Sequence, residues 1–220
     1  MASSPAVIFD VDGTLLDTNY LQVLAWWRAM RDTGHDEVAM SALHRAIGIP
    51  SDGLVRHVTG DEDEAAVEAH SERFEPLREE VVAFPRAAEL LRACADAGLK
   101  VVLATSGQPS DLDWMLPAID ADDAIAGVTT AGDVEAGKPE PDLLQTAVDQ
   151  HGLDAERCVV VGDTVWDVEA ARKAGLPCVG VLCGGIARAE LEDAGAAAVY
   201  EDPADLLAQL GDSPIGRLAG

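Results

Sequence analysis

The chain of 220 residues is long enough for one large domain, or for one domain that carries a smaller insertion, and 48% of its residues are hydrophobic. Its formal net charge of −25 argues against a nucleic-acid partner, because binding to a phosphate backbone requires clustered lysine and arginine. Apolar runs stay well short of the roughly 18 residues of a membrane span, and the first residues lead into a strand pattern rather than an export signal, so we expect a cytoplasmic protein without a membrane partner.

The chain opens with one strand and continues with a helical block. The apolar residues 6–9 form the first predicted strand. Residues 19–83 show almost no strand pattern and instead predict helices over 20–32, 37–47, 52–58 and 62–82. Phe84 and Pro85 mark the end of this block. We expect the block to form a helical cap domain, residues 19–83, above the active edge of a sheet.

After residue 86, short apolar runs alternate with amphipathic stretches. The predicted strands cover 100–104, 124–128, 158–161, 178–181 and 197–200. Predicted helices over 86–97, 141–151 and 165–174 separate them, and each of these ends at or beside a glycine. The alternation predicts an α/β fold with a doubly wound parallel, Rossmann-like sheet covered by helices on both faces. The expected core domain comprises residues 1–18 and 84–220.

Two carboxylates, Asp10 and Asp12, follow the first strand in the motif Asp-Val-Asp-Gly-Thr. Ligands of doubly wound sheets bind beyond the carboxyl ends of the strands, and strand alternation gives the two side chains similar headings. Carboxylates this close repel each other unless a cation lies between them, and Mg²⁺ prefers hard oxygen ligands. The motif therefore indicates a magnesium site, although a turn rich in aspartate that only closes the strand is the simpler alternative.

Two later segments offer groups that bind phosphate. Thr105, Ser106 and Gly107 follow the strand at 100–104, where a hydroxyl and free backbone N–H groups can hold phosphate oxygens; an ordinary helix cap is equally consistent. Lys138, one of three lysines in the chain, lies in a Gly-Lys-Pro loop. Its ammonium can offset the charge of a transferring phosphoryl group, which the acidic surface cannot do, but an exposed structural lysine remains an alternative.

The strand at 158–161 also runs into acidic residues. Asp163 lies at its end, where a third oxygen ligand is needed, and Asp167 lies one turn into the following helix. There it would either ligate a metal through water or orient Lys138. Acidic residues that favour a helix dipole are the alternative for this segment alone. Four such segments at four strand ends make chance agreement a poor explanation.

In this order, the motifs Asp-x-Asp-Gly-Thr, strand-Thr, Gly-Lys-Pro and Gly-Asp-x-x-x-Asp resemble those of the haloacid dehalogenase-like superfamily. The resemblance covers essentially the whole chain and is closest to phosphatases with a small helical cap, similar to phosphoglycolate phosphatase and β-phosphoglucomutase. It implies a Mg²⁺-dependent phosphomonoester hydrolase acting on a small phosphorylated metabolite, as a monomer or a weak dimer.

The resemblance also implies a role for each motif residue. Asp10 would be the nucleophile that forms an aspartyl-phosphate, and Asp12 the general acid and base. The remaining roles follow the same pattern: Thr105 with Ser106 and Gly107 would bind the phosphoryl group, Lys138 would stabilise its charge, and the metal would contact the Asp10 side chain, the Asp12 backbone carbonyl and Asp163, with Asp167 behind them.

Other activities of the superfamily fit the sequence less well. Dehalogenating members need no acid or base at the place of Asp12, and residues 17–85 contain no lysine for the Schiff base of phosphonate cleavage. Sugar-phosphate mutases tend to carry a histidine about where Gln22 stands and an arginine in the loop at 48–53, which has none here. Hydrolysis is favoured, with a mutase as the alternative. From a different class, a phosphoacceptor signalling domain or a non-catalytic binding protein is a further alternative.

The predicted cap offers several side chains that could contact a substrate: Gln22, Arg45 and Arg56, and also His44, His57, Trp26 and Trp27. A surface charge or a core aromatic is the simpler interpretation of each one.

Overall fold

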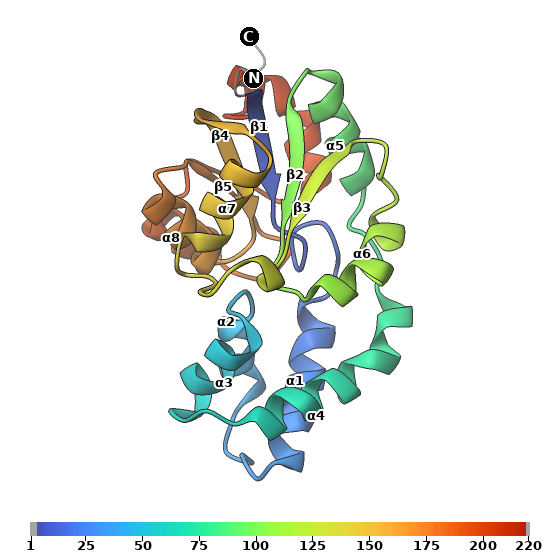
Figure 1. Cartoon of the computed structure of the whole chain (residues 1–220), viewed down its shortest axis with the longest axis vertical. Coiled ribbons are helices and arrows are strands. Elements are labelled where there is room, and N and C mark those ends of the chain that lie inside the picture. Colours follow the sequence, from blue (N-terminus) through green and yellow to red (C-terminus); the bar gives the residue numbers. More distant parts are fainter. Residues whose placement is uncertain (1–3, 219–220) are drawn as a thin grey trace.

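A computed structural model describes residues 4–218 and contains one six-stranded sheet in which every pairing is parallel. The strands are β1 (Ser4–Phe9), β2 (Lys100–Ala104), β3 (Ile125–Thr129), β4 (Leu153–Gly162), β5 (Cys178–Val181) and β6 (Ala198–Tyr200). Their order across the sheet is β3-β2-β1-β4-β5-β6 (Figure 1). The chain therefore places β2 and β3 on one side of β1 and then returns to place β4, β5 and β6 on the other side. This architecture confirms the predicted α/β fold class.

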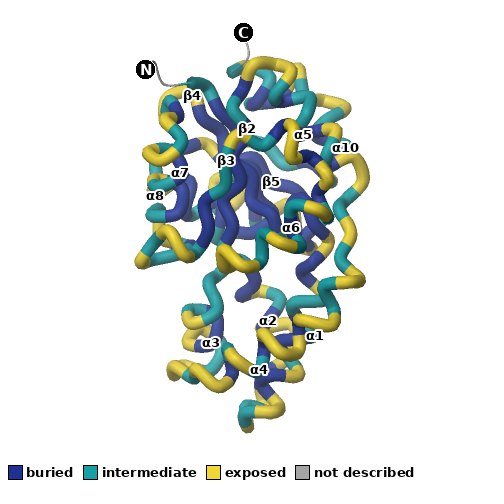
Figure 2. Tube along the Cα trace, turned by 45° about the vertical axis from the view of Figure 1, so that its right-hand side comes forward, coloured by how far each residue is buried: buried dark blue, intermediate teal, exposed yellow. Residues whose placement is uncertain are grey.

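Apolar side chains on both faces explain why these strands occupy the centre. Along β1, Val7 and Phe9 enter one buried cluster, whereas Ala6 and Ile8 enter the cluster on the opposite face. The same alternation holds for β2 and β4. Burying one such large side chain stabilises the fold by about 1.5–3 kcal/mol. Figure 2 shows the strands as the most deeply buried part of the molecule.

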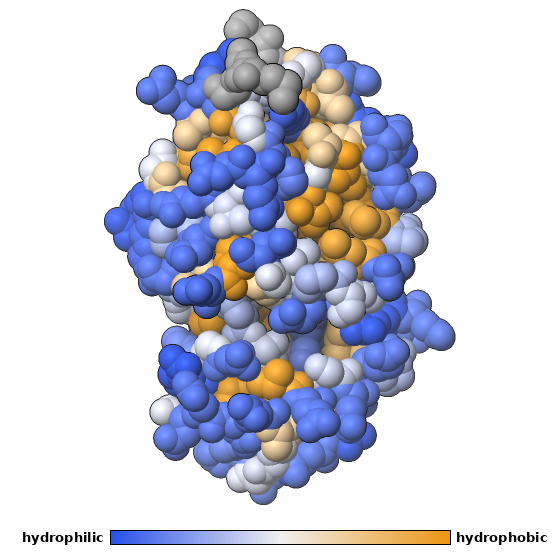
Figure 3. Space-filling model, viewed as in Figure 1, coloured by the Kyte–Doolittle hydropathy of each residue, from blue (hydrophilic) through white to orange (hydrophobic). Residues whose placement is uncertain are grey.

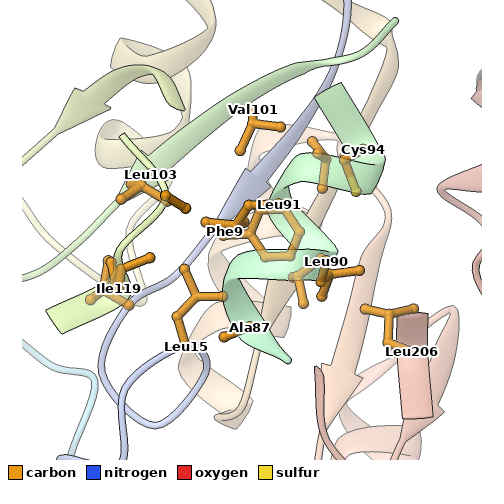
Figure 4. Packing of buried hydrophobic residues seen from close by; sticks show 14 of the residues in the cluster. Phe9, Leu15, Ala87, Leu90, Leu91, Cys94, Val101, Leu103, Ile119 and Leu206 are labelled. Atoms are coloured by element: carbon orange, nitrogen blue, oxygen red, sulfur yellow. The ribbon is translucent and has the colours of Figure 1, made fainter. Parts of the chain in front are cut away.

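Helices cover each face. Helices α5 (Ala87–Asp96), α6 (Leu112–Ile119) and α10 (Pro203–Ala208) contribute to the cluster that contains Phe9. Figure 4 shows Phe9 beside Leu90 and Leu91 of α5, with Val101 of β2 close by. Helices α7 (Asp142–Gln150), α8 (Val165–Ala174) and α9 (Arg188–Ala194) pack on the other face. The sheet is thus doubly wound.

Helices α1 (Asn19–Asp32), α2 (Met40–Ala46), α3 (Ser51–Thr59) and α4 (Glu64–Phe74) form a separate group beyond one end of the sheet (Figure 1). They enclose their own apolar cluster, which includes Trp26, Leu43 and Leu54. On the face seen in Figure 3, hydrophilic residues dominate the surface of this group. The two chain segments that connect it to the sheet run side by side, because Leu16 and Ala83 form an antiparallel bridge.

Two predicted elements differ from the structure. The helix expected over 62–82 ends at Phe74, and a 3-10 helix, η1 (Glu75–Glu80), follows. Pro76 explains the change, because it lacks an N–H and its ring crowds the preceding turn of an α-helix. Strand β4 starts at Leu153 rather than at residue 158. Within residues 4–218, none of the helices combines the length and apolar character needed to cross a membrane.

Candidate active site

The ends of β1 and β4 bring three aspartates together. Asp10 follows β1, Asp163 follows β4, and Asp167 lies in the first turn of α8. Carboxylate oxygens of the three residues all lie within 4.8 Å of one another, and all three side chains are buried. The backbone N–H of Asp10 donates to the carbonyl of Val161 at 2.9 Å, which extends the pairing of the two strands up to the carboxylates. Residues separated by more than 150 positions therefore share one site.

Lys138 supplies the positive charge at this cluster. Its ammonium contacts Oδ1 of Asp10 and lies 2.7 Å from Oδ1 of Asp167, with only 2% of the side chain exposed. Burial disfavours the charged ammonium, but the carboxylates of Asp10 and Asp167 outweigh this effect and raise the pKa of Lys138 above its ordinary value. The lysine therefore stays charged beside Asp10.

Asp163 is held by groups that the sequence analysis did not single out. The hydroxyl of Thr14 donates to Oδ1 at 3.0 Å, and the amide of Asn19 donates to Oδ2 at 2.8 Å. Gly13 adopts a φ of 77°, and a Cβ there would overlap both Asn19 and Asp163. Only glycine therefore allows the chain to turn this closely around the carboxylate. The signal in the sequence was the place of Thr14 at the end of the Asp-Val-Asp-Gly-Thr motif and of Asn19 at the start of α1.

Asp167 is fixed by the start of its own helix. Thr164 caps α8, and both its backbone N–H and its hydroxyl donate to Oδ2 of Asp167, at 3.0 and 2.6 Å. This arrangement leaves Oδ1 for Lys138. A Cβ at Gly162 would overlap the Asp167 side chain, so the close approach of β4 to the carboxylate also requires a glycine.

The cluster fits a divalent cation. Three buried carboxylates face one ammonium, so two negative charges remain without a partner. Burial raises the pKa of Asp10 to about 7, even though Lys138 acts in the opposite direction, and burial likewise raises the pKa of Asp163. The raised pKa values of both residues indicate carboxylates that need more positive charge than the protein supplies. Hard oxygen donors of this kind suit Mg²⁺.

Asp12 lies beside the cluster rather than within it. Its side chain lines the same cavity as Asp10, and its Oδ1 is buried without a hydrogen-bond partner among residues 4–218. Burial raises the pKa of Asp12, which favours a carboxyl group that holds a proton. Such a group can donate a proton to a ligand in the cavity.

A cavity of about 130 Å³ lies between the sheet edge and the helical group. Asp10 and Asp12 line one side of it, together with Ser106 and Gly107. Of the predicted phosphate-binding residues, Thr105 is buried, and its hydroxyl accepts the N–H of Gly107 at 2.9 Å. Ser106 donates to the carbonyl of Gly48 at 3.0 Å, so this loop touches the helical group directly.

The predicted substrate contacts of the helical group divide into two sets. Gln22 and Trp26 line the cavity. Arg45 and Arg56 do not line it: the first pairs with Glu190 and the second with Glu62, both at exposed positions. Surface carboxylates hold these two arginines away from the cavity. Three other candidates also lie elsewhere: His44 bonds to the carbonyl of Gly184, His57 stands against Trp166, and Trp27 lies under Arg31.

Sequence reasoning missed several residues that line the cavity, namely His70, Phe74, Arg78, Asp111 and Trp114. His70 is the most deeply placed of the ionisable ones among them. It stacks on Trp26 with ring centroids 3.9 Å apart, and its Nε2 bonds to the side-chain Oε1 of Gln22 at 2.8 Å. Burial, helped by the charge of Arg78, lowers the pKa of His70 to about 3, so the ring is neutral at ordinary pH.

Comparisons with known proteins show which family the chain resembles. The sequence model of the family described as "Haloacid dehalogenase-like hydrolase" matches residues 7–181. A phosphoglycolate phosphatase from Rhodospirillum rubrum is 30% identical over 91% of this chain and 88% of its own length, and hexitol phosphatase A from Escherichia coli is 31% identical over 79% and 81%. A hydrolase from Pseudomonas syringae has a similar structure, with a TM-score of 0.88 and 38% identity over 94% of this chain and 98% of that one.

Proposed function

Because the chain belongs to the haloacid dehalogenase-like hydrolase family and is similar to phosphatases, we propose that it is a Mg²⁺-dependent phosphomonoester hydrolase for a small phosphorylated metabolite. The observation that carries the proposal is the position of Asp10. Its carboxylate lines the cavity, contacts the buried ammonium of Lys138 and lies in a cluster of carboxylates that fits a divalent cation.

In this mechanism an oxygen of Asp10 attacks the phosphorus of the ester, and the bond between phosphorus and the leaving oxygen breaks. Asp12 donates its proton to that oxygen, so the alcohol leaves neutral. The ionised Asp12 then takes a proton from water, which attacks the aspartyl-phosphate and releases inorganic phosphate while Asp10 is restored.

Other residues of the site support these steps. Lys138 offsets the charge that gathers on the phosphoryl oxygens, and Ser106 and Gly107 border the same space. Thr105 lies directly before them and supports the turn of this loop. A Mg²⁺ ion held by Asp10, the Asp12 carbonyl and Asp163, with Asp167 behind them, would add Lewis-acid stabilisation of the phosphoryl group.

We also propose that residues 19–83 act as a cap domain and that residues 1–18 and 84–220 form the catalytic core. The separate apolar cluster of α1–α4 and the two adjacent connections at Leu16 and Ala83 support this division. A cap that covers the cavity would exclude bulk water from Asp10 during attack on phosphorus. The cytoplasmic location and the monomeric or weakly dimeric state stay predictions.

The test is phosphate release from p-nitrophenyl phosphate with Mg²⁺, for the wild type and for Asp10→Asn. The wild type should turn over and the variant should fall to background, whereas Asp96→Asn, at an exposed position, should match the wild type. Near-normal turnover by Asp10→Asn would contradict the mechanism. Interconversion of sugar-phosphate isomers without net phosphate release would favour the mutase, and a long-lived aspartyl-phosphate without turnover would favour a phosphoacceptor.

A further inference from the structure

Apart from Asp10, Asp12 and the charged residues Arg78 and Asp111, the walls of the cavity are apolar or neutral. Aromatic and aliphatic side chains make up one set: Trp26, Ile47, Ile49, Leu54, Phe74, Trp114 and Met115. Four residues add uncharged hydrogen-bonding groups: Gln22, Ser51, Ser71 and Gln108. Such walls suit a ligand that presents C–H groups to aromatic faces and hydroxyl groups to amides and other hydroxyls.

Arg78 is the only arginine or lysine among the described residues that line the cavity, and its charge is already paired. Nη1 lies 3.0 Å from Glu75, and Nη2 lies 2.9 Å from Oδ1 of Asp111. Its Nε–H is buried, so a ligand cannot reach that atom. The guanidinium therefore presents little free charge to a molecule in the cavity.

Asp111 holds this arginine from the core side. Its carboxylate also accepts the indole N–H of Trp114 at 3.2 Å and the backbone N–H of Gln108 at 2.9 Å. These bonds fix Asp111 in place, because Gln108 and Trp114 each lie three residues from it in the segment that follows β2, rather than in α1–α4. Glu75, the other partner of Arg78, is far more exposed, with 71% of its side chain accessible against 18% for Asp111. Solvent screens the pair with Glu75 more strongly, so Asp111 is the partner that neutralises most of the charge of Arg78.

A carboxylate on the leaving group would thus find no free partner. His70, the other basic side chain in the lining, is neutral at ordinary pH. An unpaired carboxylate that loses its water in such a cavity is strongly disfavoured, and the negative charge of Asp111 adds repulsion.

Resting on the proposed hydrolase function, we infer that the substrate is the phosphate ester of a short, uncharged, hydroxylated alcohol, and that Asp111 excludes anionic leaving groups by occupying Arg78. Asp111 is then a specificity-determining residue that need not take part in the chemistry at phosphorus. The cavity volume of about 130 Å³ includes the space beside Asp10 for the phosphoryl group, so it suits only a short leaving group; a cavity of roughly 150 Å³ holds a molecule of the size of benzene.

The test compares two esters that differ in one group. Glycerol 3-phosphate ends in CH₂OH where 3-phosphoglycerate carries a carboxylate. The wild type should show a kcat/KM for glycerol 3-phosphate at least about tenfold above that for 3-phosphoglycerate. Asp111→Asn keeps the shape of the side chain and frees Arg78. In this variant the ratio of kcat/KM for glycerol 3-phosphate to that for 3-phosphoglycerate should fall by about tenfold or more. Each ratio is taken within one protein, so a partly unfolded variant does not distort it.

Two controls isolate the Arg78–Asp111 pair. Glu75→Gln removes the exposed partner and should change the ratio by less than about threefold. The double variant Asp111→Asn with Arg78→Gln should return to the ratio of the wild type, because no cation then remains to pair with the carboxylate of 3-phosphoglycerate. A wild type that prefers 3-phosphoglycerate, or an unchanged ratio in Asp111→Asn, would overturn the inference.

The same comparison can be made without turnover. The affinities of the two esters are measured by calorimetry for the Asp10→Asn variant and for the double variant that also carries Asp111→Asn. Their ratio in each protein reports directly how strongly binding favours glycerol 3-phosphate over 3-phosphoglycerate. If no ester were hydrolysed by the wild type, the proposed function would fail, while these affinities would still decide the inference about the leaving group.

Discussion

The ammonium of Lys138 lies 2.7 Å from Oδ1 of Asp167 while it also contacts Asp10. One buried cation thereby joins the end of β1 to the first turn of α8. Asp167 is itself fixed by Thr164, so the position of the lysine beside the proposed nucleophile depends on a helix cap. The Asp10 carboxylate is thus oriented by α8, which contributes none of the described residues that line the cavity.

Replacing Lys138 by methionine should abolish most activity and destabilise the fold. Two buried carboxylates would lose their counter-ion, and breaking such a pair lowers the free energy of unfolding by about 3 kcal/mol or more. Phosphate release should fall at least roughly 100-fold, because the charge on the phosphoryl oxygens is no longer offset. Lys173→Met is the matched control: its pair with Glu140 is partly exposed, and the change should stay below about 1 kcal/mol. Similar behaviour of both variants in urea unfolding would contradict the role of Lys138.

Mg²⁺ should stabilise the folded protein even when no substrate is present. Binding to the native state at 100 times the dissociation constant adds about 2.7 kcal/mol, which corresponds to a rise in Tm of about 5–10 °C for a chain of this size. Thermal unfolding with Mg²⁺ and with a chelator measures this difference. Asp163→Asn should remove most of the rise, whereas the exposed Asp96→Asn should keep it. An equal rise in all three proteins would place the cation elsewhere.

His70 should make the fold less stable as the pH falls below neutrality. The pKa of His70 is lowered to about 3 in the folded state, against about 6.5 when unfolded, so the unfolded chain takes up a proton first. The stability that the neutral ring contributes is therefore complete above pH 6.5 and is lost progressively between pH 6.5 and pH 3. At pH 5 the loss amounts to about 2 kcal/mol at most.

Chemical unfolding of His70→Phe at pH 7 and pH 5 checks this expectation. Phenylalanine retains the stack on Trp26 but cannot titrate, so the drop in stability between the two pH values should shrink. His57→Gln, at an exposed position, should keep the drop of the wild type. If His70→Phe kept the full pH dependence, another group would have to be responsible.

Gly48 should tolerate alanine less well than Gly60, although both have a positive φ, 99° and 89°. Each alanine strains the backbone by about 1 kcal/mol. A Cβ at Gly60 meets open space, but one at Gly48 would lie 3.0 Å from the hydroxyl of Thr164. Since Thr164 holds Asp167, Gly48→Ala should lower kcat/KM severalfold, and Gly60→Ala should leave it unchanged. Equal kinetics for the two variants would exclude this contact from the function.

The amino-acid sequence alone determined the fold class and predicted that Asp10 and Asp163 meet at one edge of the sheet. A strand buried on both faces must be apolar at successive positions, as β1 and β4 are, and a parallel sheet collects the ends of its strands at one edge. The motifs with Asp10 and Asp163 could therefore be placed together from local patterns. Seven of the α-helices could also be anticipated from their spacing, although Pro76 ended the predicted helix over 62–82 early, and the shorter helices α6, α9 and α10 were not predicted.

The tertiary structure alone decided which charged side chains line the cavity and how they are paired. Arg78 and Asp111 are 33 residues apart and meet only because α1–α4 dock over one end of the sheet. Arg45 and Arg56 seemed equally suited in the sequence, but surface carboxylates hold them elsewhere. Periodicity reports which face of an element is buried, whereas the pairing of long, flexible charged side chains depends on the docking of distant elements, which no local pattern encodes.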